Sequence, residues 1–238
     1  MDMKISGSGA VPAGEYENIK ISGSGRLDGR VRCENLYASG SVKGDSLECR
    51  GEVGISGSGS FSGDLMAGDV SVSGSISFGG DLTADGRIEC SGSMKCKKNI
   101  KCDEFHVSGG ASVSGDVEAE KIRVSGVLNC PGLINAEEIT VKFDRGMDIG
   151  SIGGSRVTIV RDRRSGSFFN IFSLGRHAGI VWVSGAIEGD VIELENVHAP
   201  SVTGNNVKIG DGCEIGVVRY SGEVKISDKA TVGRTEKV

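Results

Sequence analysis

Three cysteines and one histidine lie close together in the middle of the chain, and these residue types could bind zinc. Cys90, Cys96 and Cys102 follow one another at six-residue intervals, and His106 comes four residues later. Thiolate sulfur and imidazole nitrogen are usual ligands of a tetrahedral zinc ion. Free cysteines, however, also commonly pack inside proteins as small hydrophobic residues. The choice between these interpretations depends on the elements that carry the four residues.

Carboxylates also recur along the chain, and paired carboxylates could hydrolyse a sugar polymer. Asp64, Asp81 and Asp116 each follow a glycine. Glycoside hydrolysis needs two carboxylates gathered beside one bond, whereas aspartates repeated at regular intervals are typical of turns. The sequence has no nucleophile elbow in a strand–turn–helix setting and no glycine-rich phosphate loop with its lysine. We therefore expect no catalytic residues, no cofactor and no metal, and predict that the chain is not an enzyme.

The elements that position these residues follow from a repeated Ser-Gly pair. The serines of this pair, which recur at nearly equal intervals, are Ser6, Ser22, Ser39, Ser56, Ser73, Ser91, Ser108 and Ser125. Apolar residues recur within each repeat at positions separated by two, as at Leu65 and Ala67. A spacing of two is the period of a β-strand with one buried face.

These spacings predict three short strands per repeat, with glycines at the corners between them. The predicted fold is all-β: a right-handed parallel β-helix, which is a three-sided solenoid with about 17 residues per turn and an inserted loop. In this fold Cys90, Cys96 and Cys102 occupy inward positions and His106 points outward. Interior packing is therefore favoured over a zinc site.

Two further groups of residues have both a chemical and a structural interpretation. Cys33 and Cys49 are predicted to be neighbours on successive turns, close enough for a disulfide. Seven cysteines in a chain without an export signal point instead to reduced thiols. A local basic stripe, made of Lys95, Lys97, Lys98 and Lys101, is interpreted as a solvated outer face.

The repeat divides the chain into three predicted segments. Residues 4–141 form the regular solenoid, residues 142–180 hold degenerate turns and an inserted basic and aromatic loop, and residues 181–235 continue the solenoid. The loop, at residues 161–177, carries an apolar cluster flanked by arginines: Phe168, Phe169, Ile171, Phe172 and Leu174. Such a cluster fits either a membrane or partner contact or packing against the coil.

Charge and hydropathy limit the partners and the compartment. The net charge of -5 argues against nucleic acid as a partner. The N-terminus has no apolar segment typical of a signal peptide, and no apolar run reaches the length of a membrane-spanning helix. We therefore expect a soluble protein of the cytoplasm.

Several of these motifs resemble those of the bactofilins, a family of bacterial cytoskeletal proteins. The resemblance rests on Ile-Ser-Gly-Ser-Gly units that begin at Ile5, Ile21 and Ile55, on the Gly-Asp corners, and on the 17-residue spacing. It implies a right-handed, three-faced β-helix that forms filaments without nucleotide and associates with the inner face of the cell membrane. It also implies a role in cell shape, motility or the positioning of client proteins.

The ends of a β-helix provide a physical reason for self-assembly. The first and last turns expose unpaired backbone groups over an apolar cross-section, and neither terminus offers an obvious cap. We expect copies of the chain to stack end to end through apolar residues of both ends: Ile5, Val11, Ile19, Val224, Ile226 and Val232. Two alternatives remain open, namely a carbohydrate-active or adhesive β-helix and a monomeric interaction module that uses the 161–177 loop.

Overall fold

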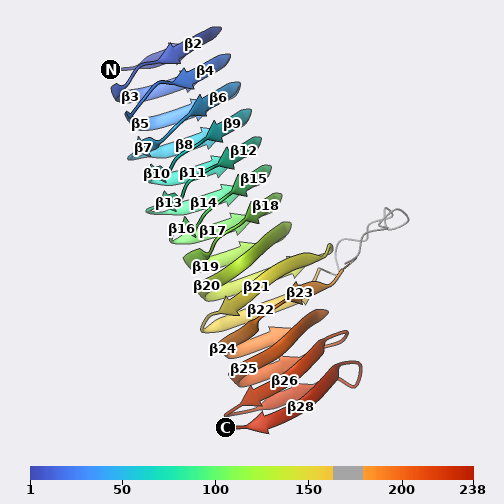
Figure 1. The fold of residues 1–238 in the computed structure, drawn as a ribbon. Coiled ribbons are helices and arrows are strands. Elements are labelled where there is room, and N and C mark those ends of the chain that lie inside the picture. Colours follow the sequence, from blue (N-terminus) through green and yellow to red (C-terminus); the bar gives the residue numbers. More distant parts are fainter. Residues whose placement is uncertain (163–178) are drawn as a thin grey trace, which may run out of the picture. The chain divides into compact units, whose positions relative to one another are not determined.

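The computed structural model describes residues 1–162 and 179–238. Within these residues the secondary structure consists of β-strands, without helices. The chain divides into two compact units, Met1–Ala119 and Glu120–Val238. Each unit is a solenoid of parallel strands, stacked turn upon turn (Figure 1). The predicted all-β solenoid is confirmed. The boundary between the units lies within β19. The division predicted from the sequence, with a break within residues 142–180, remains a prediction.

Unit 1 is built from short strands. Their bounds are β1 (Met3–Ile5), β2 (Ser8–Val11), β3 (Gly14–Ile21), β4 (Ser24–Leu27), β5 (Val31–Ala38), β6 (Ser41–Gly44), β7 (Leu47–Cys49), β8 (Glu52–Ile55), β9 (Ser58–Phe61), β10 (Leu65–Ala67), β11 (Asp69–Val72), β12 (Ser75–Phe78), β13 (Leu82–Ala84), β14 (Arg87–Cys90), β15 (Ser93–Cys96), β16 (Ile100–Lys101), β17 (Glu104–Val107), β18 (Gly110–Val113) and β19 (Val117–Val124).

Each regular turn of unit 1 contributes one strand to each of three faces. Strand β10 pairs with β13, β11 with β14, and β12 with β15. The paired residues are one repeat apart, as Leu65 and Leu82 are. Because the register equals the repeat, like residues of successive turns form columns, and the aliphatic columns face inward. The three-sided arrangement therefore follows directly from the spacing in the sequence.

Residue sizes in the core of unit 1 are complementary between turns. The rings of Phe61 and Phe78 stack with their centroids 6.1 Å apart. A Cβ atom added at Gly44 would lie 3.3 Å from the Phe61 ring, and one added at Gly59 would lie 2.9 Å from Ile76. The smallest residue thus stands beside a large one, which keeps the interior close-packed.

The Ser-Gly corner has a steric reason. A Cβ atom added at Gly57 would lie 2.0 Å from the carbonyl oxygen of Gly40, and one at Gly40 would lie 2.0 Å from that of Gly23. Successive corners approach so closely that only glycine fits. This close approach explains why glycine recurs at this corner in successive turns of unit 1.

Unit 2 contains longer strands that continue around corners. Their bounds are β20 (Val127–Phe143), β21 (Met147–Gly153), β22 (Arg156–Arg161), β23 (Val181–Val183), β24 (Ala186–Leu194), β25 (Val197–Ile209), β26 (Glu214–Tyr220), β27 (Val224–Ile226) and β28 (Thr231–Lys237).

The turns of unit 2 vary in length. Ile192 pairs with Val207, and Ile209 pairs with Ile226, so the first of these turns is shorter than the second. Met147 pairs with Val181 across a much longer stretch of chain, which contains the predicted insertion. The register at Ile209 and Ile226 is the one that the resumed repeat predicts, whereas the turn just before it is shorter than the repeat predicts.

Candidate functional site: polar ladders and terminal turns

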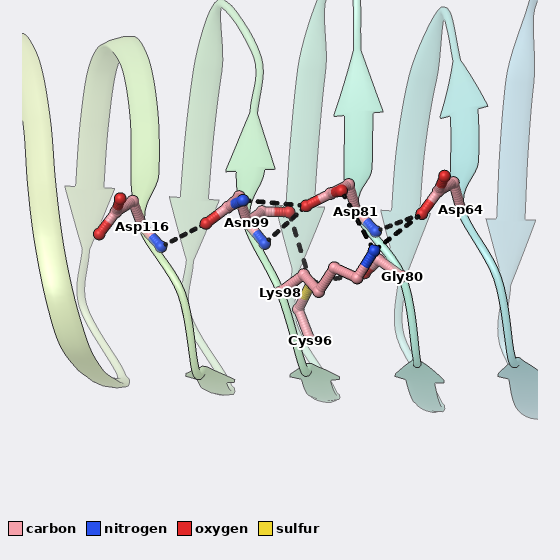
Figure 2. Close-up of polar contacts among 7 residues, drawn as sticks. All are labelled: Asp64, Gly80, Asp81, Cys96, Lys98, Asn99 and Asp116. Atoms are coloured by element: carbon pink, nitrogen blue, oxygen red, sulfur yellow. Dashed lines mark hydrogen bonds and ion pairs between the residues drawn. The ribbon is translucent and has the colours of Figure 1, made fainter.

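A ladder of carboxylates and one amide runs along a corner of unit 1 (Figure 2). Asp64 Oδ1 accepts a hydrogen bond from the backbone N–H of Asp81 at 2.8 Å, and Asp81 Oδ1 accepts one from the backbone N–H of Asn99 at 3.0 Å. Asn99 Oδ1 accepts one from the backbone N–H of Asp116 at 2.9 Å. Lys98 Nζ lies 3.6 Å from Asp81 Oδ2 and 3.9 Å from Asp64 Oδ1. Each of these three acceptors thus satisfies a backbone donor of the next turn.

These contacts agree with the interpretation of the recurring aspartates as turn residues. The carboxylates of Asp64 and Asp81 accept from backbone N–H groups and face the Lys98 ammonium (Figure 2). They are spread along the corner, one per turn, and are not gathered around a single point. The arrangement stabilises the stacking of corners.

A second ladder, which the sequence analysis did not single out, begins at the first turn. Asp2 Oδ1 accepts from the backbone N–H and the side-chain amide of Asn18, at 3.2 and 3.0 Å. Asn35 donates to Asn18 Oδ1 at 3.1 Å, and Asn35 Oδ1 accepts from the backbone N–H of Glu52 at 3.1 Å. The recurrence of asparagine one repeat apart, at Asn18 and Asn35, was the available signal, and an analysis based on apolar spacing overlooked it.

The three cysteines that suggested a zinc site lie on different faces of the core. Cys90 ends β14, Cys96 ends β15 and Cys102 follows β16, and all three are buried. His106, on β17, is half-buried and alternates with buried residues on either side. Burial raises the pKa of the Cys90 thiol to about 11 and that of Cys102 to about 12. Across residues 1–162 and 179–238, no group of three or more His, Cys, Asp or Glu side chains is placed to hold a metal ion.

The last turn of unit 2 exposes apolar side chains that are buried one turn earlier. Ile226 is 39% exposed, whereas its partner Ile209 is 1% exposed. Val224 and Val232 are likewise half-buried, although Val207 is buried. Strand β27 pairs with β25 and strand β28 pairs with β26, each along one edge. This terminal turn therefore presents a backbone edge beside apolar side chains.

The first turn of unit 1 differs from the last turn of unit 2. Ile5 is 7% exposed, and Val11 and Ile19 are fully buried. Tyr16 is also buried, and its hydroxyl donates to the carbonyl oxygen of Pro12 at 2.9 Å. The three residues predicted for an interface at this end thus support the turn from within.

Two exposed aromatic residues were not singled out by the sequence analysis. Tyr37 is 39% exposed, its ring packs over Gly54, and its hydroxyl donates to Glu52 Oε2 at 3.0 Å. Trp182, in unit 2, is 40% exposed and lies 4.5 Å from the ring of His198. Exposed aromatic rings of this kind are suited to contacts with other molecules.

The predicted membrane or partner cluster lies outside the described residues. It comprises Phe168, Phe169, Ile171, Phe172 and Leu174. Within the part of the chain that the structure covers, no helix is long and apolar enough to cross a membrane.

Residues 1–81 match the bactofilin family, which is described as polymer-forming and cytoskeletal. The match covers about a third of the chain. The matched residues lie entirely within unit 1.

Two curated relatives also resemble parts of the chain. The uncharacterized protein YhbE of Bacillus subtilis (strain 168) is 48% identical over 52 residues, which cover 22% of this chain and 22% of YhbE. The uncharacterized protein YhbF of the same organism is 39% identical over 72 residues, which cover 30% of this chain and 27% of YhbF. The matches thus span about a quarter of the length of each relative. No solved structure matches the chain significantly.

Proposed function

We propose that the chain is the subunit of a cytoskeletal filament and polymerises end to end through its terminal turns, without nucleotide. The match of residues 1–81 to the bactofilin family supports the filament-forming role. The observation that supports the end-to-end arrangement is the exposure of Ile226, at 39%, against 1% for Ile209 one turn earlier.

The free energy for this contact would come from the interactions that already join successive turns. Covering the exposed part of one aliphatic side chain such as Ile226 contributes about 1 kcal/mol. Each backbone hydrogen bond gained along the edges of β27 and β28 adds a net contribution of about 1 kcal/mol. Micromolar association requires about 8 kcal/mol net, and immobilisation costs roughly a further 4–15 kcal/mol. A dozen or more such contacts, spread over the whole terminal turn, would therefore be needed. No nucleotide is needed as an energy source.

The buried residues of the first turn have a different role in this proposal. Ile5, Val11 and Ile19 are buried within their own unit. A substitution at any of them would therefore lower the stability of the subunit, and its effect on assembly could not be separated from that loss. At this end β1 pairs with β3, and β2 pairs with β4. The opposite edges of β1 and β2 would form backbone hydrogen bonds with a second copy of the chain.

The decisive experiment uses Ile226→Arg, which places a charge in the proposed contact at a position already exposed in the subunit. We expect negative-stain electron microscopy without nucleotide to show filaments of the unaltered chain and none of the variant, whose thermal unfolding should be unchanged. Met66→Arg is the matched control, because Met66 is 56% exposed on β10, away from the terminal turns. Unchanged filaments with Ile226→Arg would exclude this contact, and single particles of the unaltered chain would favour the monomeric interaction module.

We further propose that the filaments lie in the cytoplasm at the inner face of the membrane, where they organise client proteins in a process such as cell shape or motility. The arginine-flanked cluster at residues 168–174 supports this location, since basic and aromatic segments favour membrane interfaces. Changing Phe168, Phe169 and Phe172 to serine should weaken cosedimentation with anionic liposomes several-fold while leaving filaments intact. Equal binding by the variant would favour packing of this segment on the coil.

A further inference from the structure

Two cysteines of unit 1 lie directly opposite each other on paired strands. Cys33, on β5, is in register with Cys49, on β7. The environment of Cys90 is different, since its neighbours on the adjacent turns are Val72 and Val107. Cys33 and Cys49 therefore form a dithiol on adjacent turns, and Tyr16 is in register with Cys33 on the preceding turn.

The two thiols interact and are not equivalent. The Cys33 thiol hydrogen-bonds to Cys49, and Cys49 Sγ donates to the carbonyl oxygen of Glu34 at 3.1 Å. The hydrogen bond from Cys33, aided by backbone N–H groups, lowers the pKa of Cys49 although burial opposes this change. The same hydrogen bond and burial raise the pKa of Cys33. Cys49 is thus the sulfur that ionises first, and Cys33 keeps its proton.

A surface hollow borders Cys33, and Cys49 lies behind it on the paired strand. It has a volume of about 380 Å³, and its lining includes Tyr16, Arg32, Cys33, Glu34 and Arg50. Cys33 and Cys49 are only 4% and 3% exposed. A small oxidant can approach through such a hollow, whereas a bulky thiol reagent is excluded. The thiolate is the reactive form of cysteine, and the Glu34 carboxylate on the wall of the hollow raises the pKa of both thiols.

We propose that Cys33 and Cys49 are a peroxide-reactive dithiol that closes into a reversible disulfide between adjacent turns. The Cys49 thiolate attacks one peroxide oxygen, the O–O bond breaks, and Cys49 becomes a sulfenic acid as hydroxide leaves. The Cys33 thiol then attacks the sulfenic sulfur, and its proton leaves with the second oxygen as water. The two sulfurs lose two electrons in total, and one hydrogen peroxide is reduced to two waters.

The spacing of the strands makes this disulfide easy to reduce. Adjacent strands lie about 4.8 Å apart, and Cβ atoms in parallel register keep nearly that separation, whereas an unstrained disulfide prefers about 3.8 Å between Cβ atoms. Strained disulfides have more oxidising potentials and are labile. We therefore expect dithiothreitol to restore both thiols in the folded protein.

Tryptic mapping of the full chain tests the proposal. After treatment with hydrogen peroxide and catalase, the protein is unfolded in N-ethylmaleimide and digested. Trypsin cuts after Arg32, Lys43 and Arg50, so Cys33 and Cys49 fall on separate peptides that only a disulfide joins. We expect the linked peptides, residues 33–43 and 44–50, with a mass two hydrogens below their sum, and expect dithiothreitol to abolish them.

Matched variants and the other cysteines provide the controls. Cys90→Ser should leave the linked peptides unchanged, whereas Cys33→Ser should remove them and let Cys49 proceed to the sulfinic acid. If Cys33→Ser fails to fold, the measurement on the unaltered chain still decides. Recovery of Cys33 and Cys49 as separate alkylated peptides, in the same fraction as Cys90, would overturn the proposal. So would a link that appears only when peroxide is added in denaturant.

Discussion

Asn99 occupies a position in the corner ladder that aspartates fill at residues 64, 81 and 116, and its side chain both donates and accepts. Its amide donates to Asp81 Oδ1 at 3.0 Å, and its Oδ1 accepts from the backbone N–H of Asp116 at 2.9 Å. Asn99→Ala removes both hydrogen bonds. Because the corner is exposed to water, we expect the free energy of unfolding to fall by only about 1 kcal/mol, measured by urea denaturation.

Lys97→Ala provides the reference for the loss of unfolding free energy in Asn99→Ala. Lys97 is exposed next to the same corner, and Lys97→Ala should change the free energy of unfolding by less than about 0.5 kcal/mol. Asn99→Asp keeps the acceptor for Asp116 and loses the donor to Asp81, so it should be intermediate. If Asn99→Ala were as stable as Lys97→Ala, the ladder would contribute nothing to the stacking of turns.

Prediction at the scale of single residues succeeded for apolar positions and was incomplete for polar ones. The inward positions of Cys90, Cys96 and Cys102 follow from alternation, because a one-residue shift would expose every neighbour of the strand. The Asn18–Asn35 ladder did not follow in the same way. The recurrence of asparagine indicates a column, but the sequence does not say whether the amides of that column face water or hydrogen-bond to the next turn.

The corner glycines permit a test at the scale of the structural element. Gly57 and Gly7 occupy equivalent Ser-Gly pairs, but a Cβ atom added at Gly57 would lie 2.0 Å from the Gly40 carbonyl oxygen, whereas one at Gly7 would meet nothing within 4 Å. Gly57→Ala should therefore lower the free energy of unfolding by about 2 kcal/mol or more, because the two corners must separate.

The same measurement on Gly7→Ala isolates the cause. Both substitutions change the flexibility of the unfolded chain alike, so the difference between them reports the contact between corners. Thermal unfolding midpoints of the two variants should differ by several degrees, with Gly57→Ala the lower. Equal midpoints would mean that the corners can move apart without cost.

The elements were most predictable where the corner motif is regular. In unit 1 the constant repeat places Leu65 opposite Leu82, as observed. In unit 2 the Ser-Gly pair no longer marks each turn, and the strands continue through corners, so the shorter step from Ile192 to Val207 had no signal in the sequence. The predicted interface residues Val224 and Ile226 lie on β27, and their role in assembly stays a prediction.

At the scale of the whole molecule, assembly should depend on protein concentration and not on a nucleotide. If the contact between ends supplies the free energy, a contact that does not close on itself produces open filaments above a threshold concentration. We expect pelleting assays to give the same sedimented fraction with apyrase, with EDTA or with added ATP or GTP, and a reduced fraction on dilution. A nucleotide requirement for pelleting would contradict this view.

The equality of register and repeat has a consequence for how such a protein can change. Leu65 faces Leu47 on one side and Leu82 on the other, so excision of residues 65–81 would bring Leu47 opposite Leu82 with the pairing intact. Insertion of one more turn of the same length would likewise leave the strand pairing intact. Gene duplication and loss can therefore lengthen or shorten the protein by whole turns, while the surfaces at its two termini, and any partner that they bind, are inherited unchanged.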